Sequence, residues 1–275
     1  MENIQLGGIN LKILVLLKQV PDSDEVKLNP ETGTMIREGV GTVINPLDLH
    51  ALEAALRIKE TGDHSVTVVS MGPPVAEEAV KEAIAMGADR AVLLTDRKFA
   101  GADTWATAMA LARFAELKGH FDLILAGEKA TDGETGQVGP ETGAMLGIPV
   151  ATYVSRIVKL DESGITIERE VEDGKEVWKL PLPSLVSVTK DVNEPRLPTL
   201  NGKKLARKAS VERIGNDFLG IDPSEIGLTG SPTRVVRIGT PKLSRKVEMY
   251  EGSKIRDGID EIKKRLVPYL EVNHE

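Results

Sequence analysis

Lys12-Ile-Leu-Val-Leu-Leu17 is a short and almost entirely apolar stretch near the start of the sequence. Such a run is typical of a strand in a parallel sheet that is covered on both faces. Three later runs have the same character: Val66-Thr-Val-Val-Ser-Met71, Ala91-Val-Leu-Leu-Thr95 and Asp122-Leu-Ile-Leu-Ala-Gly127. Segments with helical periodicity lie between them. The sequence therefore predicts an α/β fold with a doubly wound, mostly parallel sheet.

Residues that start and stop helices support this pattern. Asn45-Pro46 offers an N-cap followed by proline at the first helical position. Pro73-Pro74 opens a second helix, which Gly87 closes as a C-terminal cap. A third helix is predicted over residues 102–118, ending at Gly119.

The second half of the chain alternates apolar and polar residues. Residues 165–171 and 176–180 alternate on either side of Glu172-Asp-Gly-Lys175, which predicts an antiparallel hairpin insertion over residues 164–181. Leu185-Val-Ser-Val188 reads as one more apolar strand.

Residues 193 to about 240 are rich in Pro, Gly, Lys and Arg and show little periodicity. This composition predicts an extended arm that a neighbouring subunit stabilises. A last helix is predicted from Lys254 to Leu270, with apolar residues at helical spacing. We therefore expect residues 1–190 to form the α/β domain, with its hairpin, and residues 191–275 to form a C-terminal arm that ends in a helix.

Composition limits the function. The 275 residues are 41% hydrophobic and 28% charged, which is enough apolar material for a large core, and the net charge of −7 argues against nucleic acid as the main partner. Cysteine is absent, so any redox role must use a bound organic cofactor or another subunit. No run approaches the roughly 18 apolar residues of a membrane helix, and no leader is recognisable, so we expect a cytoplasmic protein without direct membrane insertion.

Three loops that follow the predicted strands are candidate ligand loops: Lys18–Asp22, Met71–Pro74 and Gly127–Pro140. The last loop holds Gly133, Gly136 and Gly139 just before a predicted helix. Glycine lets the backbone approach a ligand closely, and the free N–H groups of a helix start favour phosphate. The loop matches neither standard nucleotide fingerprint, so glycines that only turn the chain are an open alternative. The four histidines are scattered, and we expect no metal site and no catalytic side chain.

The loop Gly127–Pro140, the segment Ala85-Met-Gly-Ala-Asp-Arg90 and the segment Asn193-Glu-Pro-Arg196 resemble the electron-transferring flavoprotein β subunit family. The resemblance extends along nearly the whole chain. It implies an α subunit that carries FAD and an adenine nucleotide held by this chain. A lone ATP-binding protein with the same kind of sheet is a weaker alternative, because it leaves the hairpin, the arm and the last helix without a purpose.

Asp132-Gly-Glu-Thr-Gly-Gln-Val-Gly-Pro140 is similar to the loop of the bifurcating branch of that family, with Glu134 and Gly136 in place of Asp and Ala. The resemblance then implies that the chain binds FAD, accepts hydride from NADH, and passes electrons to the FAD of the α subunit and to a low-potential acceptor such as ferredoxin. The alternative is the non-bifurcating branch, which holds AMP and shuttles electrons from acyl-CoA dehydrogenases to a quinone oxidoreductase.

The resemblance also implies two sets of site residues. In the family, an apolar residue before the Asn-Glu-Pro-Arg segment anchors a flavoprotein dehydrogenase; here that residue is Val192. The expected partner-binding residues are Val192, Asn193, Glu194, Pro195 and Arg196. The expected cofactor-binding residues are Leu17, Lys18, Asn45, Met71, Gly72, Asp132, Gly133, Thr135, Gly136, Gln137 and Val138.

Overall fold

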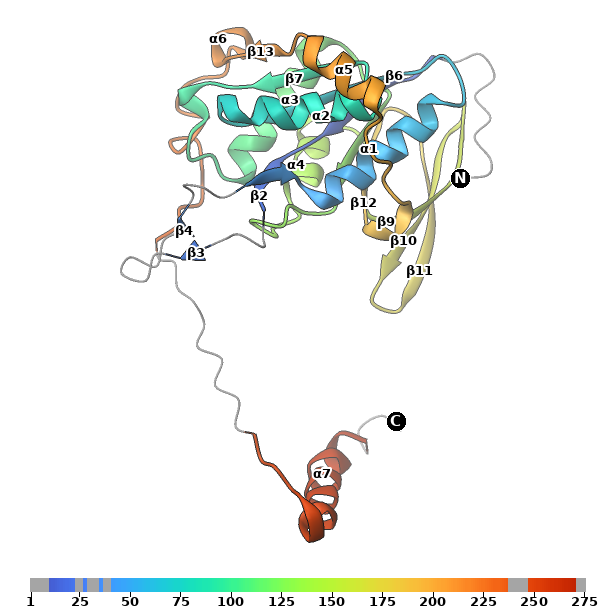
Figure 1. Cartoon of the computed structure of the whole chain (residues 1–275). Coiled ribbons are helices and arrows are strands. Elements are labelled where there is room, and N and C mark those ends of the chain that lie inside the picture. Colours follow the sequence, from blue (N-terminus) through green and yellow to red (C-terminus); the bar gives the residue numbers. More distant parts are fainter. Residues whose placement is uncertain (1–9, 23–26, 29–34, 37–40, 237–246, 271–275) are drawn as a thin grey trace. The chain divides into compact units, whose positions relative to one another are not determined.

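The computed structural model describes residues 10–22, 27–28, 35–36, 41–236 and 247–270. Its contacts divide the chain into two compact units, residues 1–236 and residues 237–275. The second unit contains α7 (Ile255–Leu270), preceded by a short 3-10 turn, η5 (Gly252–Lys254), so the predicted last helix is confirmed (Figure 1). The first unit contains the sheet.

A nine-stranded sheet runs through the first unit in the order β11-β10-β9-β12-β8-β1-β6-β7-β13. In this spatial order, each strand from β9 through β12, β8, β1, β6 and β7 to β13 pairs in parallel with the next. The strand β10 runs antiparallel to both of its neighbours, β9 and β11. The predicted α/β fold with a mostly parallel sheet is therefore confirmed. The parallel strands are β1 (Lys12–Leu16), β6 (Ser65–Met71), β7 (Arg90–Leu94), β8 (Leu123–Gly127), β9 (Val150–Asp161), β12 (Ser184–Val188) and β13 (Glu212–Ile214).

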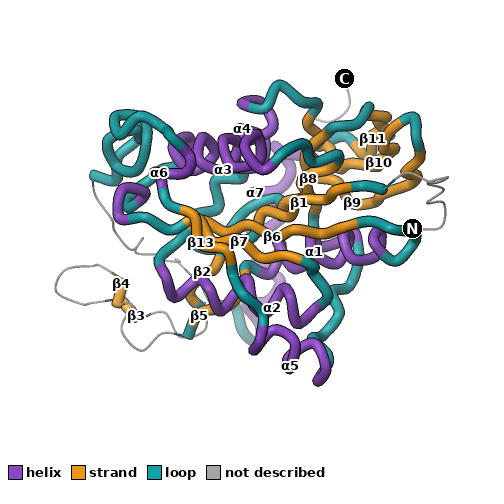
Figure 2. The backbone as a smooth tube through the Cα atoms, turned by 90° about the horizontal axis from the view of Figure 1, so that it is seen from above, coloured by secondary structure: helices purple, strands orange, loops and turns teal. Residues whose placement is uncertain are grey.

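Helices cover both faces of this sheet (Figures 1 and 2). Ile13 and Val15 of β1 pack with α1 (Pro46–Lys59) and α2 (Glu77–Met86), because alternate residues of a strand point to opposite faces. Leu14 and Leu16 pack with α3 (Thr104–Lys118) on the other face. The helix α4 (Val138–Met145) lies beside α3 and against β12. The two apolar layers explain why β1 has no polar face.

The path of the chain creates a break in strand order beside β1. From β1 the chain passes through α1 to β6 and through α2 to β7, moving towards one edge. It then returns through α3 to β8, on the other side of β1. Ligands of such sheets bind at the carboxyl ends of the strands, where the order reverses. The fold therefore places a crevice at the ends of β1 and β8.

The predicted hairpin is present as β10 (Gly164–Val171) and β11 (Gly174–Leu180). Its partner β9 was not foreseen. The buried apolar residues of β9 recur every third residue, at Ala151, Val154, Ile157 and Leu160, because irregularities in pairing shift the register against both neighbouring strands. An apolar residue at every third position does not predict a strand, because the side chains of a half-buried strand alternate between buried and exposed with a period of two.

Residues 193–236 differ from the extended arm that their composition suggests. The helix α5 (Leu200–Lys208) packs on α2, β13 extends the sheet beside β7, and α6 (Asn216–Leu219) contacts α3. The boundary between compact units consequently lies at 236/237 and not at 190/191. Sequence periodicity gives little sign of α5, because Ala206 is its one fully buried residue.

Two small antiparallel ribbons lie outside the main sheet: β2 (Gln19–Pro21) with β5 (Thr42–Ile44), and β3 (Lys27–Leu28) with β4 (Met35–Ile36). Among the residues that the structure describes, no helix is both long and apolar enough to cross a membrane.

The contact of α5 with α2 can be tested at Gly202. A Cβ atom at this position would lie 2.0 Å from the carbonyl oxygen of Ala85. The higher helix propensity of alanine should stabilise the fold of Gly202→Ala by about 1 kcal/mol. Overpacking typically costs about 1–3 kcal/mol, and here the added methyl group would meet the backbone of Ala85, which cannot move aside as a side chain can. We expect a net loss of about 1 kcal/mol or more in urea unfolding, while the exposed neighbour Asn201→Ala changes it by about 0.5 kcal/mol at most. A variant G202A as stable as the parent would contradict this packing.

Candidate functional site

A cavity of about 1010 Å³ opens at the carboxyl ends of β1, β6, β7 and β8. Leu17 and Lys18 follow β1, Met71 ends β6 and Gly72 follows it, and Gly127 ends β8. This is the position that the reversal of strand order predicts. The volume lies at the upper end of the range of about 300–1,000 Å³ that is usual for small-molecule sites.

One end of the cavity is polar. Thr135, Gly136 and Gln137 line it and lead into the first turn of α4. Gly136 has a φ of 64°, which favours glycine, and Gln137 occupies the N-cap position without a side-chain cap bond. The first N–H groups of α4 therefore have no side-chain partner and carry the positive end of the helix dipole. This end of the cavity suits an anionic group such as a phosphate.

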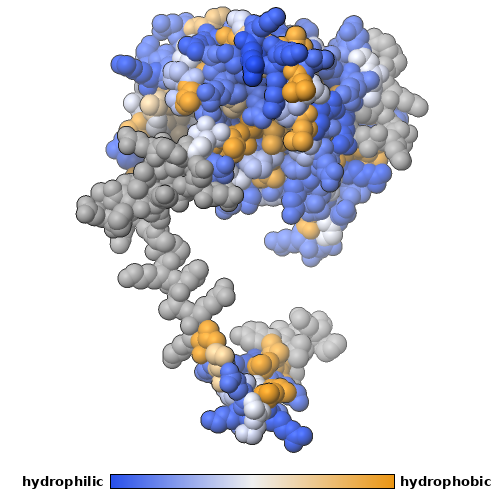
Figure 3. All heavy atoms as spheres, in the orientation of Figure 1, coloured by the Kyte–Doolittle hydropathy of each residue, from blue (hydrophilic) through white to orange (hydrophobic). Residues whose placement is uncertain are grey.

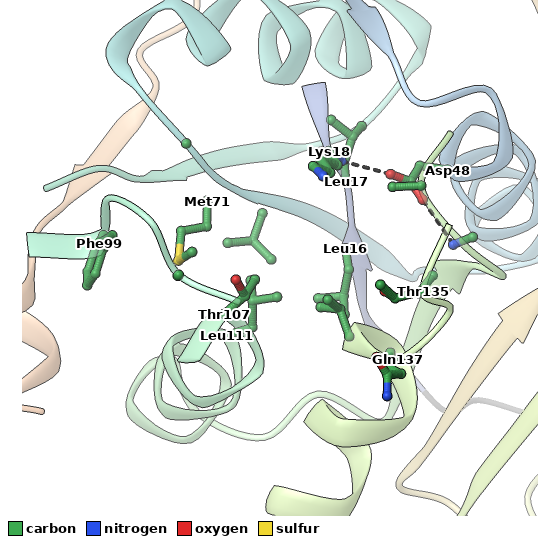
Figure 4. A pocket seen from close by; sticks show the side chains of 18 of the residues that line it. Leu16, Leu17, Lys18, Asp48, Met71, Phe99, Thr107, Leu111, Thr135 and Gln137 are labelled. Atoms are coloured by element: carbon green, nitrogen blue, oxygen red, sulfur yellow. Dashed lines mark hydrogen bonds between the residues drawn. The ribbon is translucent and has the colours of Figure 1, made fainter. Parts of the chain in front are cut away.

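The other end of the cavity is apolar. Phe99 and Leu111 are buried and line this region together with Val69, Leu16 and Met71. Figure 4 shows Phe99 and Met71 on the opposite side of the view from Thr135 and Gln137, with Leu111 and Leu16 between them. A ligand that fills the whole cavity must therefore combine a polar, anionic part with an extended apolar part.

Asp48, in the first turn of α1, joins the ends of β1 and β8 at the cavity wall. Its carboxylate accepts hydrogen bonds from the backbone N–H of Lys18, at 2.8 Å, and from that of Gly127, at 3.1 Å (Figure 4). Gly127 has no room for a side chain, because a Cβ atom would lie 2.5 Å from the Asp48 carboxylate. Burial raises the pKa of Asp48 to about 7, although the backbone N–H of Lys18 and the side chain of Asn45 oppose the rise.

Asn45 does not cap α1 with its side chain, although the sequence suggested that it would. Its buried amide instead donates to the carbonyl of Lys129, at 2.9 Å, and accepts from the N–H of Thr131, at 3.2 Å. Asp132 forms an ion pair with Lys18 at 2.7 Å. Both side chains thus hold the loop that follows β8 against the rest of the site.

The structure brings most of the expected cofactor residues to the cavity. Asn45, Asp132 and Gly133 are not among the lining residues, and the first two act by holding the loop. Sequence reasoning missed Asp48, Phe99, Thr107 and Leu111. Asp48 lies on α1, Thr107 and Leu111 lie on α3, and Phe99 lies in the loop after β7, which was not among the candidate ligand loops. A polar residue among the apolar residues of α1 was the available signal for Asp48. The expected residues that line the cavity are Leu17, Lys18, Met71, Gly72, Thr135, Gly136, Gln137 and Val138.

The expected partner-binding segment lies along α1. Arg196 forms an ion pair with the buried carboxylate of Glu53, at 2.7 Å, and a second with Glu60. The side-chain amide of Asn193 donates to the carbonyl of His50, at 2.9 Å. Burial alone would raise the pKa of Glu53, but hydrogen bonds from Arg196 and Arg57 hold that pKa below its usual value. The segment is thus fixed to α1 by charged and neutral hydrogen bonds.

Within the described part of the chain, no three His, Cys, Asp or Glu side chains gather in a way that could hold a metal ion. The cavity offers organic ligands backbone donors, hydroxyl and amide groups, the cationic side chains of Lys18, Lys129 and Arg97, and an apolar wall.

Comparisons with known proteins give a consistent result. Residues 32–218 match the family model described as "Electron transfer flavoprotein domain". An electron transfer flavoprotein subunit beta of Thermoanaerobacterium thermosaccharolyticum is 47% identical over 257 residues, 93% of this chain and 98% of the relative. Subunit CarD of the caffeyl-CoA reductase-Etf complex of Acetobacterium woodii is 43% identical over 265 residues, 96% of this chain and 99% of the relative. The protein FixA of Azorhizobium caulinodans is 43% identical over 238 residues, 84% of this chain and 85% of the relative.

The raised pKa of Asp48 predicts a pH-dependent stability. The unfolded carboxyl ionises near pH 4 and the folded one near pH 7, so the unfolding free energy falls as pH rises through this window and levels off above it. The neutral variant Asp48→Asn lacks this titration. Urea unfolding at pH 5, 6, 7 and 8 should show a parent-minus-D48N difference that falls by up to about 1.4 kcal/mol per pH unit below pH 7. A difference that stays constant from pH 5 to pH 8 would contradict a raised pKa.

Proposed function

The chain belongs to the electron transfer flavoprotein family as a β subunit, and from this we propose that it binds FAD in the cavity and works as the NADH-oxidising subunit of a bifurcating complex. A β subunit has an α subunit as its partner. When bound, FAD would take hydride from NADH and supply electrons to the FAD of the α subunit and to a low-potential acceptor such as ferredoxin. The proposal includes a cytoplasmic location, where NADH is available.

The cavity has one polar end and one apolar end, and this is the observation that supports FAD most directly. In the proposed complex, the first turn of α4, with Gly136 and Thr135, binds the diphosphate through backbone N–H and hydroxyl groups. Phe99 and Leu111 cover the apolar part of the ligand and exclude water from it. Lys18 adds a positive charge at the polar end, where its ion pair with Asp132 keeps it in place.

AMP is the alternative ligand, and with it the chain would be a non-bifurcating carrier between acyl-CoA dehydrogenases and a quinone oxidoreductase. AMP has a phosphate and an adenosine, so it suits the polar end of the cavity. It has no second ring system for the apolar wall around Phe99 and Leu111. Leaving apolar surface of this kind uncovered forgoes favourable burial. We therefore favour FAD, with AMP as the second candidate.

A flavoprotein dehydrogenase or reductase is the proposed electron-exchange partner. CarD is named as a subunit of a complex that contains a caffeyl-CoA reductase, and it covers 96% of this chain. We extend that association to this chain as a proposal for acyl-CoA-oxidising or acyl-CoA-reducing flavoproteins as a class. The segment Val192–Arg196 belongs to the region that we propose for docking of this partner.

Nucleotide content distinguishes the two candidates. The chain is co-produced with its α subunit, the heterodimer is purified without added nucleotide, and the released nucleotides are counted by chromatography. We expect two FAD molecules per heterodimer. One FAD together with one AMP would contradict the proposal.

A larger side chain at the apolar end of the cavity should prevent FAD from binding to this chain and leave the FAD of the α subunit in place. Leu111→Trp places a larger side chain between Leu16 and Met71 and so narrows the apolar end of the cavity. We expect the narrowed space to exclude the flavin ring. We expect the flavin count to fall from two to one per heterodimer. Leu117→Trp is the matched control, because Leu117 lies on the same helix but is exposed. Two FAD molecules retained by L111W would argue against the apolar end as the flavin site.

A further inference from the structure

The last part of the first unit lies against the apolar wall of the cavity. Residues 226–233, here called the strap, contact residues 97–103, here called the wall turn, which follow β7 and contain the 3-10 turn η3 (Arg97–Phe99). We propose that the strap positions the apolar wall, so that binding of FAD and attachment of the strap stabilise each other. The inference rests on the proposed function, because FAD is the ligand that covers this wall.

The wall turn forms a large part of the cavity wall but has little internal support. The residues of the wall turn that line the cavity are Arg97, Phe99, Ala100, Gly101 and Ala102. Its regular structure is the single turn η3, and such turns have few hydrogen bonds of their own. Segments with few internal contacts open locally at a low free energy. The position of the wall therefore depends on what packs against it.

The first half of the strap packs on the wall turn. The N–H of Leu228 donates to the carbonyl of Ala100, at 3.0 Å. Gly227 has a φ of 56°, and a Cβ atom at this position would lie 2.1 Å from a carbonyl oxygen of the wall turn. Ile226 belongs to the same buried apolar cluster as Phe99. The strap thus contacts both the backbone and the apolar side chains that form the wall.

Asp103, at the end of the wall turn, holds the second half of the strap. Its carboxylate accepts two hydrogen bonds from Thr233, one from the backbone N–H at 2.9 Å and one from the hydroxyl at 2.8 Å. Its backbone N–H donates to the hydroxyl of Ser231, at 2.8 Å, and that hydroxyl donates to the carbonyl of Gly227, at 2.7 Å. Burial alone would raise the pKa of Asp103, but hydrogen bonds from Ala106 and Thr233 hold that pKa below its usual value. Charge-assisted hydrogen bonds therefore hold the strap at neutral pH.

Asp103 also connects the strap to a second part of the cavity wall. Its other carboxylate oxygen accepts from the N–H of Ala106, at 3.1 Å, and so caps α3. The helix α3 supplies Thr107 and Leu111 to the cavity. One side chain thus joins the strap, the wall turn and the start of α3.

The apolar contacts of the strap are directed inward. Thr229 and Thr233 are exposed, whereas Ile226 is buried. Leu228 is half-exposed, but it covers Gly101, where a Cβ atom would lie only 3.1 Å from the Leu228 side chain. The face of the first unit drawn in Figure 3 is likewise mostly hydrophilic, with apolar side chains in small groups. We therefore assign the strap a role towards the cavity.

Local opening of the wall turn explains how the strap and the ligand are coupled. A ligand that covers the apolar wall binds only when the wall is in place, so its apparent affinity falls with the fraction of molecules in which the wall turn is closed. Attachment of the strap raises that fraction. By linkage, the bound ligand must hold the strap in place to the same extent. In the proposed complexes FAD covers this wall and AMP does not, so we expect the coupling with FAD alone.

The first test measures nucleotide affinity by titration calorimetry. It uses the heterodimer of this chain and its α subunit, with the α-subunit flavin in place and the nucleotide of this chain removed. The double variant Ser231→Ala/Thr233→Val lacks both hydroxyls that bond to Asp103 and leaves Asp103 to cap α3. We expect its Kd for FAD to rise at least about threefold, and its Kd for AMP to stay within about twofold of the parent value.

The matched control is Ser224→Ala/Thr229→Val, which removes the same two hydroxyl types from the same region. Ser224 bonds to Asp222 in its own turn, and Thr229 is exposed. Both Kd values of this control should stay within about twofold of the parent values. Urea unfolding of each heterodimer is measured in parallel, so that a general loss of stability is recognised separately from a selective loss of FAD affinity.

Hydrogen exchange provides a readout that a purely structural strap would not change. Exchange of the backbone amides in residues 226–233 is followed by mass spectrometry with and without FAD. We expect FAD to slow this exchange at least about threefold. The hairpin, residues 164–180, does not line the cavity and should exchange equally in both samples.

Three results would overturn the role of the strap: an unchanged Kd for FAD in S231A/T233V, an equal rise of the Kd for AMP, or exchange of the strap that does not respond to FAD. A parent heterodimer that binds AMP more tightly than FAD would contradict the nucleotide proposal alone, because FAD still reports on the strap as long as it binds. A parent heterodimer that binds no FAD at this site would overturn both.

Discussion

The loops that follow two paired strands, β1 and β8, have to be held together to form one wall of the cavity. Asp48 makes this connection, because its buried carboxylate accepts a hydrogen bond from the backbone N–H of Lys18, the second residue after β1, and one from the N–H of Gly127, the last residue of β8. The chain leaves β1 towards α1 on one face of the sheet and leaves β8 towards α4 on the other face, so the two strands share no loop. Asp48 therefore helps to set the spacing of the two loops at the cavity wall, together with Asn45 and the Lys18–Asp132 ion pair. The cost of this arrangement is a buried acid whose pKa lies near 7.

The helix α1 supports both the loops around the cavity and the segment from Asn193 to Arg196. Its start supplies Asn45 and Asp48 to the loops around the cavity, and its middle supplies His50 and Glu53 to the segment from Asn193 to Arg196. Most of its inward-facing residues are small or branched apolar side chains that pack on the sheet. Because one helix carries both sets of contacts, it links the loops around the cavity to the segment that leads into α5.

Much of the fold could be predicted from the sequence because its signals are local. The apolar runs that became β1, β6, β7 and β8, and the proline and glycine residues at helix ends, are decided by neighbouring residues. The strand β9 and the helix α5 were not predictable in this way. Bulges changed the burial period of β9, and the helix α5 depends on one close contact of Gly202 with α2, which is distant in sequence. For the site, the glycine-containing loop could be recognised from the sequence, whereas the roles of Asn45 and Asp132 as supports and of Leu111 as a wall depend on tertiary packing.

The central claim is that the cavity prefers a ligand with an anionic part and an extended apolar part. Titration calorimetry on the nucleotide-depleted heterodimer tests it most directly, with the α-subunit flavin restored before FAD and AMP are compared at the vacant site. The account predicts that FAD binds with a Kd at least about tenfold lower than that of AMP and displaces it, because only FAD covers Phe99 and Leu111. An AMP affinity equal to or higher than that of FAD would contradict the account.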